Sequence, residues 1–286
     1  MESVTSRQNA VVKTFRNLAG RRGEGDRQVL LEGEHLLSEA LSAGLRVTTA
    51  ALASRVLARE ADSNQARVRV LADRLRQQGA RVLTVSETVL AAMSPVRTPS
   101  GIVAIAEFIA PPLERVMEGP LPLVALLAGV QDPGNLGAVV RTAEAAGATG
   151  LVACPPSADP FGWKALRGAM GSTFRLPVPE RVPLHEALLA ARRRGLVIAA
   201  AVPRGGTPMH EFDFRRPVAL MLGGEGGGLD EAHVDHADER ITIPMKPPVE
   251  SLNVAVSAAV MLYEAARQRA PRGHVLHSPT SHDQAP

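Results

Sequence analysis

The first stretch of this sequence whose residue types suit chemistry is QDPGNLGAVVRTAEAAGATG, at residues 131–150. Its opening turn is followed by a helix that we expect to begin near Asn135. When this helix is plotted at about 100° per residue, one side is apolar, and Arg141 points elsewhere, beside alanines. A surface with such small side chains indicates that another group packs close to the guanidinium. The alternatives are that Asn135 is an ordinary helix cap and that Arg141 is a surface charge.

A second stretch, VALMLGGEGGGLDEA, reads as a strand followed by a glycine-rich loop that contains Glu225. Glycines after a strand allow a ligand to approach the backbone, and their spacing is weakly similar to a dinucleotide fingerprint. A phosphate site would exclude an anion, yet Glu225 lies in the middle of the loop. We therefore expect a ligand that offers hydroxyl groups or positive charge. The alternatives are a flexible turn with an exposed glutamate and a nicotinamide-dependent oxidoreductase.

The third stretch, ITIPMKPPVESLNVAVSAAVMLYEAARQR, predicts a strand that ends at residues 243–245, a proline-rich loop and a helix from about Ser251. This helix is small or apolar on nearly every side between residues 252 and 262, so more than its own sheet should cover it. A partner subunit is a natural cover. Ser251 and Asn253 as simple helix caps are the alternative to a functional role.

The elements that must position these turns form two α/β units. Short apolar runs alternate with helical segments as far as residue 108, which predicts a small α/β domain at residues 1–108. Four prolines in IAPPLERVMEGPLP indicate a linker at residues 109–120. Residues 121–271 predict a parallel sheet covered on both faces by helices. Residues 272–286 have little to bury and are expected to be a disordered tail.

Composition narrows the class of protein. The 286 residues are 45% hydrophobic, enough for two cores, and no apolar run reaches the length of a membrane-spanning helix. We therefore expect a cytoplasmic protein with no membrane partner. The single cysteine, Cys154, is expected in the core, and the histidines of the tail, His274, His277 and His282, are not expected to hold a metal.

Charge is compatible with a nucleic-acid partner without requiring one. The net charge is +3, and KTFRNLAGRRGEGDR at residues 13–27 is a basic cluster that suits phosphates but equally describes a solvated loop. Aromatic residues make up only 3% of the chain, which argues against a domain that stacks a row of splayed bases.

The three stretches, in this order, strongly resemble the signature motifs of SpoU-type RNA 2'-O-methyltransferases, the TrmH-like branch of the SPOUT superfamily. The motifs are DPGNLGAVVRTAEAAG, LGGEGGGL and IPMKPPVESLNVAVSAA, and the similarity covers about residues 121–270. Two N-terminal segments, VLLEGEHLLSEAL and TPSGIVAIAEF, resemble the substrate-binding domain related to ribosomal protein L30e that accompanies many of these enzymes.

This resemblance implies a Rossmann-like parallel sheet with a deep trefoil knot, S-adenosylmethionine as cofactor, no metal, and a homodimer whose active site uses both chains. It implies an RNA partner, most simply 23S-type ribosomal RNA because of the extra N-terminal domain. Transfer RNA as substrate, or a non-catalytic RNA-binding protein with the same fold, are the alternatives. The family's functional polar residues match Arg141, Asn135, Glu225, Ser251 and Asn253. Cofactor contacts are implied at Leu222, Gly223, Gly224, Ile243, Met245, Leu252 and Asn253.

The reaction that the resemblance implies suggests a role for Arg141. A ribose 2'-hydroxyl must lose its proton as it attacks a methyl group in line. A guanidinium keeps its proton at neutral pH, so Arg141 is expected to anchor the adjacent phosphate and stabilise the developing alkoxide. Asn135 and Asn253 would orient it, and Glu225 and Ser251 would shape the site. The chain departs from the common family pattern at Gly224, Gly168 and Ala169, none of which removes a reacting group.

Overall fold

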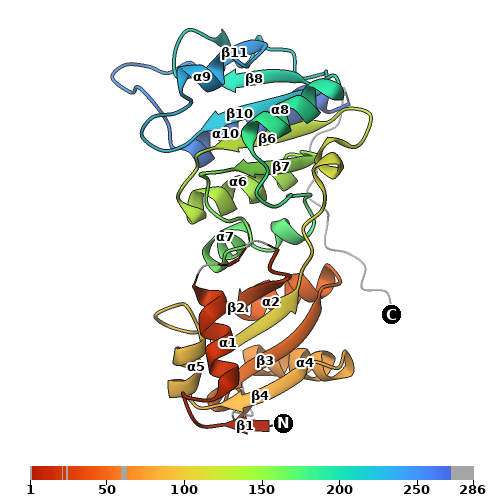
Figure 1. Cartoon of the computed structure of the whole chain (residues 1–286), viewed down its shortest axis with the longest axis vertical. Helices are drawn as coiled ribbons and strands as arrows, with labels where there is room; N and C mark the ends of the chain where they lie inside the picture. The colour runs from red at the N-terminus through yellow and green to blue at the C-terminus, as the bar shows by residue number, and fades with distance from the viewer. Residues whose placement is uncertain (1, 21, 24, 59–62, 272–286) are drawn as a thin grey trace.

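The protein consists of two α/β lobes, each with its own sheet, arranged one above the other along the long axis of the molecule (Figure 1). The structure is a computed structural model that describes residues 2–20, 22–23, 25–58 and 63–271. We call residues before 109 the N-terminal lobe and residues after 120 the C-terminal lobe. The predicted tail, with its three histidines, lies outside the described residues.

The N-terminal lobe has a five-stranded mixed sheet with the order β1-β4-β3-β5-β2. Its strands are β1 (Glu2–Val4), β2 (Gln28–Glu32), β3 (Arg46–Ala53), β4 (Arg81–Val85) and β5 (Ile102–Glu107). Its helices are α1 (Ala10–Ala19), α2 (Glu34–Ser42), α3 (Ser54–Ala58), α4 (Ser63–Gln77) and α5 (Glu87–Met93). Because side chains alternate along a strand, the sheet buries residues on both faces. One face packs against α1 and α5, and the other packs against α2 and α4.

The C-terminal lobe has a six-stranded sheet with the order β7-β6-β10-β8-β11-β9, and every strand pair is parallel. Its strands are β6 (Leu123–Ala128), β7 (Gly150–Cys154), β8 (Val197–Ala201), β9 (Thr207–Pro208), β10 (Val218–Gly223) and β11 (Glu239–Thr242). Its helices are α6 (Pro133–Ala145), α7 (Trp163–Ala169), α8 (Leu184–Arg193), α9 (Glu231–Val234) and α10 (Val254–Arg269), with a 3-10 turn η2 (Ser172–Phe174). A second 3-10 turn, η1 (Leu113–Met117), lies between the two lobes in the sequence.

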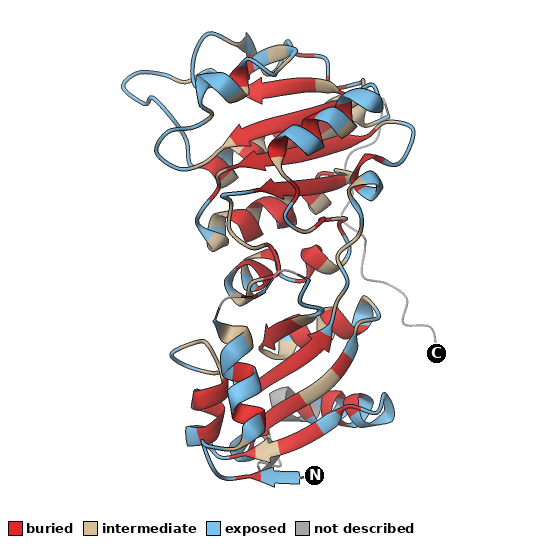
Figure 2. Ribbon diagram, viewed as in Figure 1, coloured by how far each residue is buried: buried red, intermediate tan, exposed pale blue. Residues whose placement is uncertain are grey.

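Helices cover both faces of this parallel sheet, as the continuous apolar runs predict. The helices α6 and α10 pack on one face, and α8, α9 and η1 pack on the other. The central strands are accordingly buried along their length (Figure 2). Since parallel strands all end at the same edge, the loops after β6, β8, β10 and β11 meet there. This edge is where the predicted functional turns lie.

Two predicted boundaries differ from the structure. The strand expected to end at residues 243–245 is β11, which ends at Thr242 because the proline-rich loop after it cannot continue the ladder. The predicted linker contains η1, and Val116 and Met117 of this turn are buried. Gly150 allows the close approach, since a Cβ there would lie 2.4 Å from Val116 Cβ.

The end of α10 is fastened to the beginning of the C-terminal lobe. The guanidinium of Arg269 donates hydrogen bonds to the backbone carbonyls of Phe214, Leu121, Pro122 and Arg216. This one side chain therefore links the segment before β6 to the segment before β10 by hydrogen bonds.

The two lobes are joined by buried and charged contacts. Arg22, in the predicted basic cluster, is only 6% exposed, forms ion pairs with Asp159 and Glu180, and lies over the ring of Phe161. Neither alternative left open for this cluster, a phosphate site or a solvated loop, holds at Arg22, because it is buried and paired with carboxylates of the other lobe. A second arginine, Arg175, pairs with a carboxylate of each lobe, Glu39 and Glu144.

Cys154 lies in the core. It is fully buried at the end of β7, as expected from its position in an apolar strand. Burial raises the pKa of its thiol to about 12. In the described part of the chain, none of the helices has the length and apolarity that crossing a bilayer requires. The same residues contain no group of three or more His, Cys, Asp or Glu side chains placed to hold a metal ion.

Candidate active site

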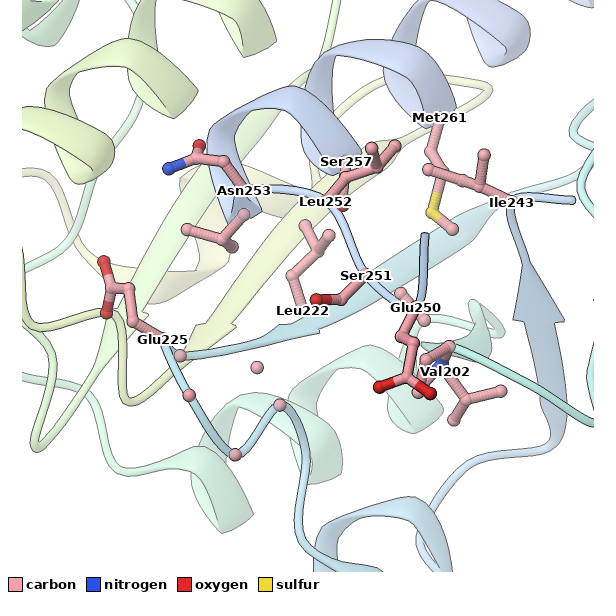
Figure 3. A pocket seen from close by; sticks show the side chains of 18 of the residues that line it. Val202, Leu222, Glu225, Ile243, Glu250, Ser251, Leu252, Asn253, Ser257 and Met261 are labelled. Atoms are coloured by element: carbon pink, nitrogen blue, oxygen red, sulfur yellow. The ribbon is translucent and has the colours of Figure 1, made fainter. Parts of the chain in front are cut away.

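A cavity of about 550 Å³ lies at the carboxyl edge of the C-terminal sheet. Its walls are the ends of β8 and β10, the glycine-rich loop after β10, the loop after β11 and the first turns of α10 (Figure 3). We call it the knot-edge cavity, after the trefoil knot that the resemblance implies. All seven residues that the resemblance implies as cofactor contacts line it: Leu222, Gly223, Gly224, Ile243, Met245, Leu252 and Asn253.

The glycine-rich loop is tightly folded on its own backbone. Gly224 and Gly228 form an isolated antiparallel bridge, and Gly226 and Gly228 have φ angles of +84° and +66°. A Cβ at Gly223 would lie 2.0 Å from the carbonyl carbon of Gly228, and one at Gly224 would lie 1.9 Å from the carbonyl oxygen of Gly129. Glycine at 223 and 224 is therefore required for the backbone to close around one end of the cavity.

The helix of the first motif, α6, begins at Pro133 rather than near Asn135. Asp132 is the N-cap, and its carboxylate accepts a hydrogen bond from the backbone N–H of Asn135 at 2.8 Å. Asp and Asn are equally good caps, so the sequence alone did not distinguish them. Because Asp132 supplies the cap, the side chain of Asn135 is free to bond elsewhere.

The helix of the third motif, α10, begins at Val254 rather than near Ser251. Asn253 is its N-cap, and the amide oxygen accepts hydrogen bonds from the backbone N–H groups of Ala255 and Val256. The predicted alternative of a capping role is correct for Asn253. Ser251 does not cap the helix, and it lines the knot-edge cavity.

Three side chains, one from each motif, form a directed chain of hydrogen bonds. Capping α10 engages the oxygen of Asn253, so its amide nitrogen donates to Asn135 Oδ1 at 3.1 Å. The nitrogen of Asn135 then donates to Glu225 Oε1 at 2.8 Å. The cap of one helix therefore sets the orientation of both amides. Neither amide bonds to Arg141 within the described residues of the same chain.

Glu225 receives further donors from the loop after β6. Its carboxylate accepts from the backbone N–H of Gln131 at 3.0 Å and of Asp132 at 3.4 Å. Burial by itself would raise the pKa of Glu225, but the hydrogen bonds from Asn135 and from the two backbone groups outweigh it and lower the pKa. The side chain is an anion at neutral pH and fastens the glycine-rich loop to the start of α6.

Arg141 lies apart from this cluster. It is exposed on α6, does not line the knot-edge cavity, and has no hydrogen bond or ion pair with the described residues. Six residues of helix separate it from Asn135, which is about 9 Å along the axis and about 240° around it. The side chain thus points away from Asn135, onto the face beside Ala138 and Ala145. Within one chain, the structure does not bring Arg141 together with the other four polar residues.

Comparison with known proteins agrees with the motif arrangement. The SpoU rRNA Methylase family model matches residues 122–263, and the MRM3-like substrate binding domain model matches residues 9–104. The 23S rRNA (guanosine(2553)-2'-O)-methyltransferase RlmP of Bacillus subtilis is 32% identical, over 92% of this chain and 98% of its own. The chain belongs to the SpoU rRNA methylase family.

Other similarities to this family extend over nearly the whole length. An uncharacterised tRNA/rRNA methyltransferase of Synechocystis is 37% identical, over 93% of this chain and 94% of its own. The crystal structure of an AdoMet-bound rRNA methyltransferase from Sinorhizobium meliloti has a TM-score of 0.82 at 29% identity, covering 94% of this chain and 99% of that one. The resemblance to SpoU-type methyltransferases noted in the sequence is confirmed.

Several residues of this SpoU-family cavity were not predicted. They are Ala201, Val202, Pro203, Glu250, Ser257 and Met261. Ala201 is the last residue of β8, and residues 202–203 follow it; this strand was recognised in the sequence, but not as a neighbour of β10. Parallel strands of one sheet end at the same edge, so the residues after each strand are candidates for the site. The order of the strands, which puts β8 beside β10, is not readable from a single sequence. Ser257 and Met261 lie one and two turns beyond Asn253 on α10, a spacing that places all three near one face.

Proposed function

We propose that this SpoU-family protein transfers a methyl group from S-adenosylmethionine to a ribose 2'-hydroxyl of ribosomal RNA, of the 23S type. The observation that carries the proposal is the bonded chain from Asn253 through Asn135 to Glu225, which joins all three motifs at the rim of the knot-edge cavity. The B. subtilis relative, similar along almost its whole length, is named for this reaction on 23S rRNA.

The residues of the cavity fit the cofactor. Apolar side chains, Leu222, Ile243 and Met261 among them, offer contacts for an adenine ring, and the volume of about 550 Å³ is ordinary for such a ligand. Glycine backbone approaches one end closely, and the carboxylates of Glu225 and Glu250 lie on the rim. Glu250 pairs with Arg204 at 2.9 Å, so the charge without a cationic partner among the described residues is that of Glu225. This charge suits a positively charged sulfonium and amino group, and it would repel a phosphate. When bound, the cofactor supplies an electrophilic methyl group.

The protein's own residues then have separable tasks. Glu225 and the two asparagines hold the loops in place, since every one of their bonds runs between motifs or to a helix cap. An ionised carboxylate with three donors and a lowered pKa is a weak base, so we assign it to positioning. The side chain of Arg141 has no partner among the described residues of its own chain and is free to anchor a phosphate and stabilise an alkoxide.

We propose that a second copy of the chain completes the site. On α10, Val256 is 48% exposed and Tyr263 is 47% exposed, although α10 also packs on the sheet. An apolar helix with an uncovered face next to the cavity suits a two-fold interface. Such an interface would bring Arg141 of each protomer toward the cavity of its partner, which its position within one chain does not achieve.

The finer features of the fold implied by the resemblance are also proposals. We propose that residues 1–108 form an L30e-like RNA-binding domain, joined by residues 109–120 to a catalytic domain at 121–271. We further propose that the loops around the cavity form a deep trefoil knot. Residues of the loop after β11 and of the glycine-rich loop line the same cavity, which supports this. A ribosomal RNA substrate implies a cytoplasmic enzyme.

The decisive experiment maps ribose methyl groups by mass spectrometry in ribosomal and transfer RNA from cells with and without the gene. We expect one 2'-O-methyl group of the large-subunit RNA to disappear and to return with the wild-type gene but not with Arg141→Ala. A methyl group lost only from transfer RNA would refute the ribosomal substrate. Unchanged methylation of both RNAs would refute the enzymatic proposal.

A further inference from the structure

A second cavity, of about 590 Å³, opens between the two lobes. One wall comes from the N-terminal lobe at Gly20 and Arg22, and the other comes from the segment between β7 and α7 and from residues 180–181. We call it the interlobe cavity. It shares no lining residue with the knot-edge cavity.

The wall of the interlobe cavity is hydrogen-bonded to a loop of the proposed active site. Pro133, the first residue of α6, lies in its wall. Ser157, also in the wall, accepts hydrogen bonds from the backbone N–H groups of Gly129 and Val130, each at 3.0 Å. The next residue, Gln131, donates to Glu225. A ligand in the interlobe cavity would therefore lie against the same loop that holds the glycine-rich loop.

The charges in this cavity favour an anion. Three cations, Arg22, Lys164 and Arg181, face two carboxylates, Asp159 and Glu180. Both carboxylates pair with Arg22. Lys164 and Arg181 are exposed and have no acidic partner among the described residues. Arg181 also has a φ angle of +50°, a conformation that a side-chain-bearing residue rarely adopts and that is commonest at functional sites.

The cavity wall also contains Trp163, the only tryptophan of the chain. Its side chain is partly exposed, and the ammonium of Lys164 lies 5.4 Å from its ring centroid. A protein with so few aromatic residues cannot stack a row of bases. A single indole beside two cations that have no acidic partner among the described residues is nevertheless sufficient to hold one base and its phosphates.

We propose that the interlobe cavity binds one unstacked nucleotide of the RNA substrate, with its base against Trp163 and its phosphates on Lys164 and Arg181. The target ribose lies at the knot-edge cavity, so the same RNA strand would run along the carboxyl edge of the sheet past α6. The proposal rests on the proposed function, because it names a second contact for the same substrate.

Since Trp163 is the only tryptophan, intrinsic fluorescence of the full-length protein reports directly on this cavity. The probes are a mixed-sequence single-stranded RNA of ten nucleotides and an abasic strand of the same length. We expect the RNA to quench the emission in a saturable manner and the abasic strand to bind without quenching. Binding of the RNA with unchanged emission would overturn the proposal.

A double variant, Lys164→Ala with Arg181→Ala, tests the phosphate contacts without disturbing buried groups. We expect about tenfold weaker RNA binding and a fall of about 1.4 in the slope of log affinity against log salt, since two phosphate contacts to a single strand are lost. Arg193→Ala removes an exposed arginine of α8, outside the cavity, and should change affinity less than about twofold. Equal effects of the double variant and the control would also overturn the proposal.

Calorimetric titration with S-adenosylmethionine separates this site from the proposed function. The double variant should bind the cofactor as the wild type does, because the two cavities share no lining residue. Quenching without methylation of ribosomal RNA would leave the nucleotide site standing and refute the proposed substrate. Methylation of ribosomal RNA at wild-type KM by the double variant would refute the nucleotide site and leave the proposed substrate standing.

Discussion

Glu225 shows how an acidic residue serves a ligand site without taking part in proton transfer. Three donors from the first motif surround its carboxylate, and they hold its pKa below the ordinary value of 4.5 even though burial acts in the opposite direction. The residue is charged whenever the protein is near neutral pH. Its contribution is therefore positional. Loss of Glu225 should weaken cofactor binding more directly than it slows the chemical step.

Replacing Glu225 with glutamine keeps the shape of the side chain and removes the charge. We expect Glu225→Gln to weaken binding of S-adenosylmethionine about fivefold, because charge-assisted hydrogen bonds become neutral ones at a cost of about 1 kcal/mol. Calorimetric titration at pH 7 measures this. Glu231→Gln on α9, whose side chain is 87% exposed and does not line the cavity, is the matched control and should bind normally.

The pH dependence follows from the direction of the shift. A carboxyl with a lowered folded pKa stabilises the folded loop above its ordinary value of 4.5, and this stabilisation is lost as the pH falls through the lower folded pKa. The difference in cofactor affinity between wild type and Glu225→Gln should accordingly be largest near neutral pH and shrink below pH 4.5. A difference that does not shrink at any acidic pH at which the protein stays folded would argue against the ionised network.

At the scale of the elements, the glycine-rich loop is the most constrained. We expect Gly224→Ala to lower the free energy of unfolding by about 1–3 kcal/mol, because the new Cβ would meet the carbonyl oxygen of Gly129 and backbone must move. Urea denaturation followed by circular dichroism measures it. Gly227→Ala is the control, since no atom lies within 4 Å of a Cβ there and no positive φ is required. Equal stability of the two variants would show that the loop adapts.

The elements themselves were largely predictable, and their ends were not. Buried parallel strands read as continuous apolar runs, so the covered parallel sheet followed from the sequence. The starts of α6 and α10 were displaced by two or three residues, because each helix is preceded by more than one residue type able to cap it. The cofactor residues came from resemblance to a family. Local pattern does not reveal that Asn135 would bond to Glu225, since the two are 90 residues apart.

At the scale of the whole molecule, Arg22 shows what a charge pattern cannot tell. It belongs to a basic run that suited either phosphates or solvent, yet its ion-pair partner Asp159 lies 137 residues away in the other lobe. Sequence spacing does not reveal such a pair. Burial of the arginine makes it part of the junction between the lobes.

We expect Arg22→Ala to lower the free energy of unfolding by about 2–3 kcal/mol, because two partly buried carboxylates lose their cation. Differential scanning calorimetry measures the change. Arg46→Ala breaks the exposed pair with Glu107 and should cost less than about 1 kcal/mol. A small effect at both sites would indicate that the lobes do not depend on the buried pair.

Mixing two inactive variants tests whether Arg141 acts across a dimer. Arg141→Ala lacks the guanidinium, and Val202→Trp fills the knot-edge cavity. If each site uses Arg141 of the partner, mixed dimers contain one intact site, and random exchange should restore about a quarter of wild-type turnover. Methyl transfer from labelled cofactor after co-refolding measures this. No recovery would mean that Arg141 acts within its own chain.

The hydrogen bonds of Arg269 affect when the C-terminal lobe can fold during translation. Its guanidinium donates to four backbone carbonyls at residues 121, 122, 214 and 216. The ribosome adds Arg269 about 150 residues after the first of these carbonyls. During translation, the C-terminal sheet cannot be sealed until that residue has left the ribosomal exit tunnel. Strands β6 and β10 also pair across a long separation, and such nonlocal pairing is slow. The nascent chain should therefore stay sensitive to protease until Arg269 has emerged from the tunnel.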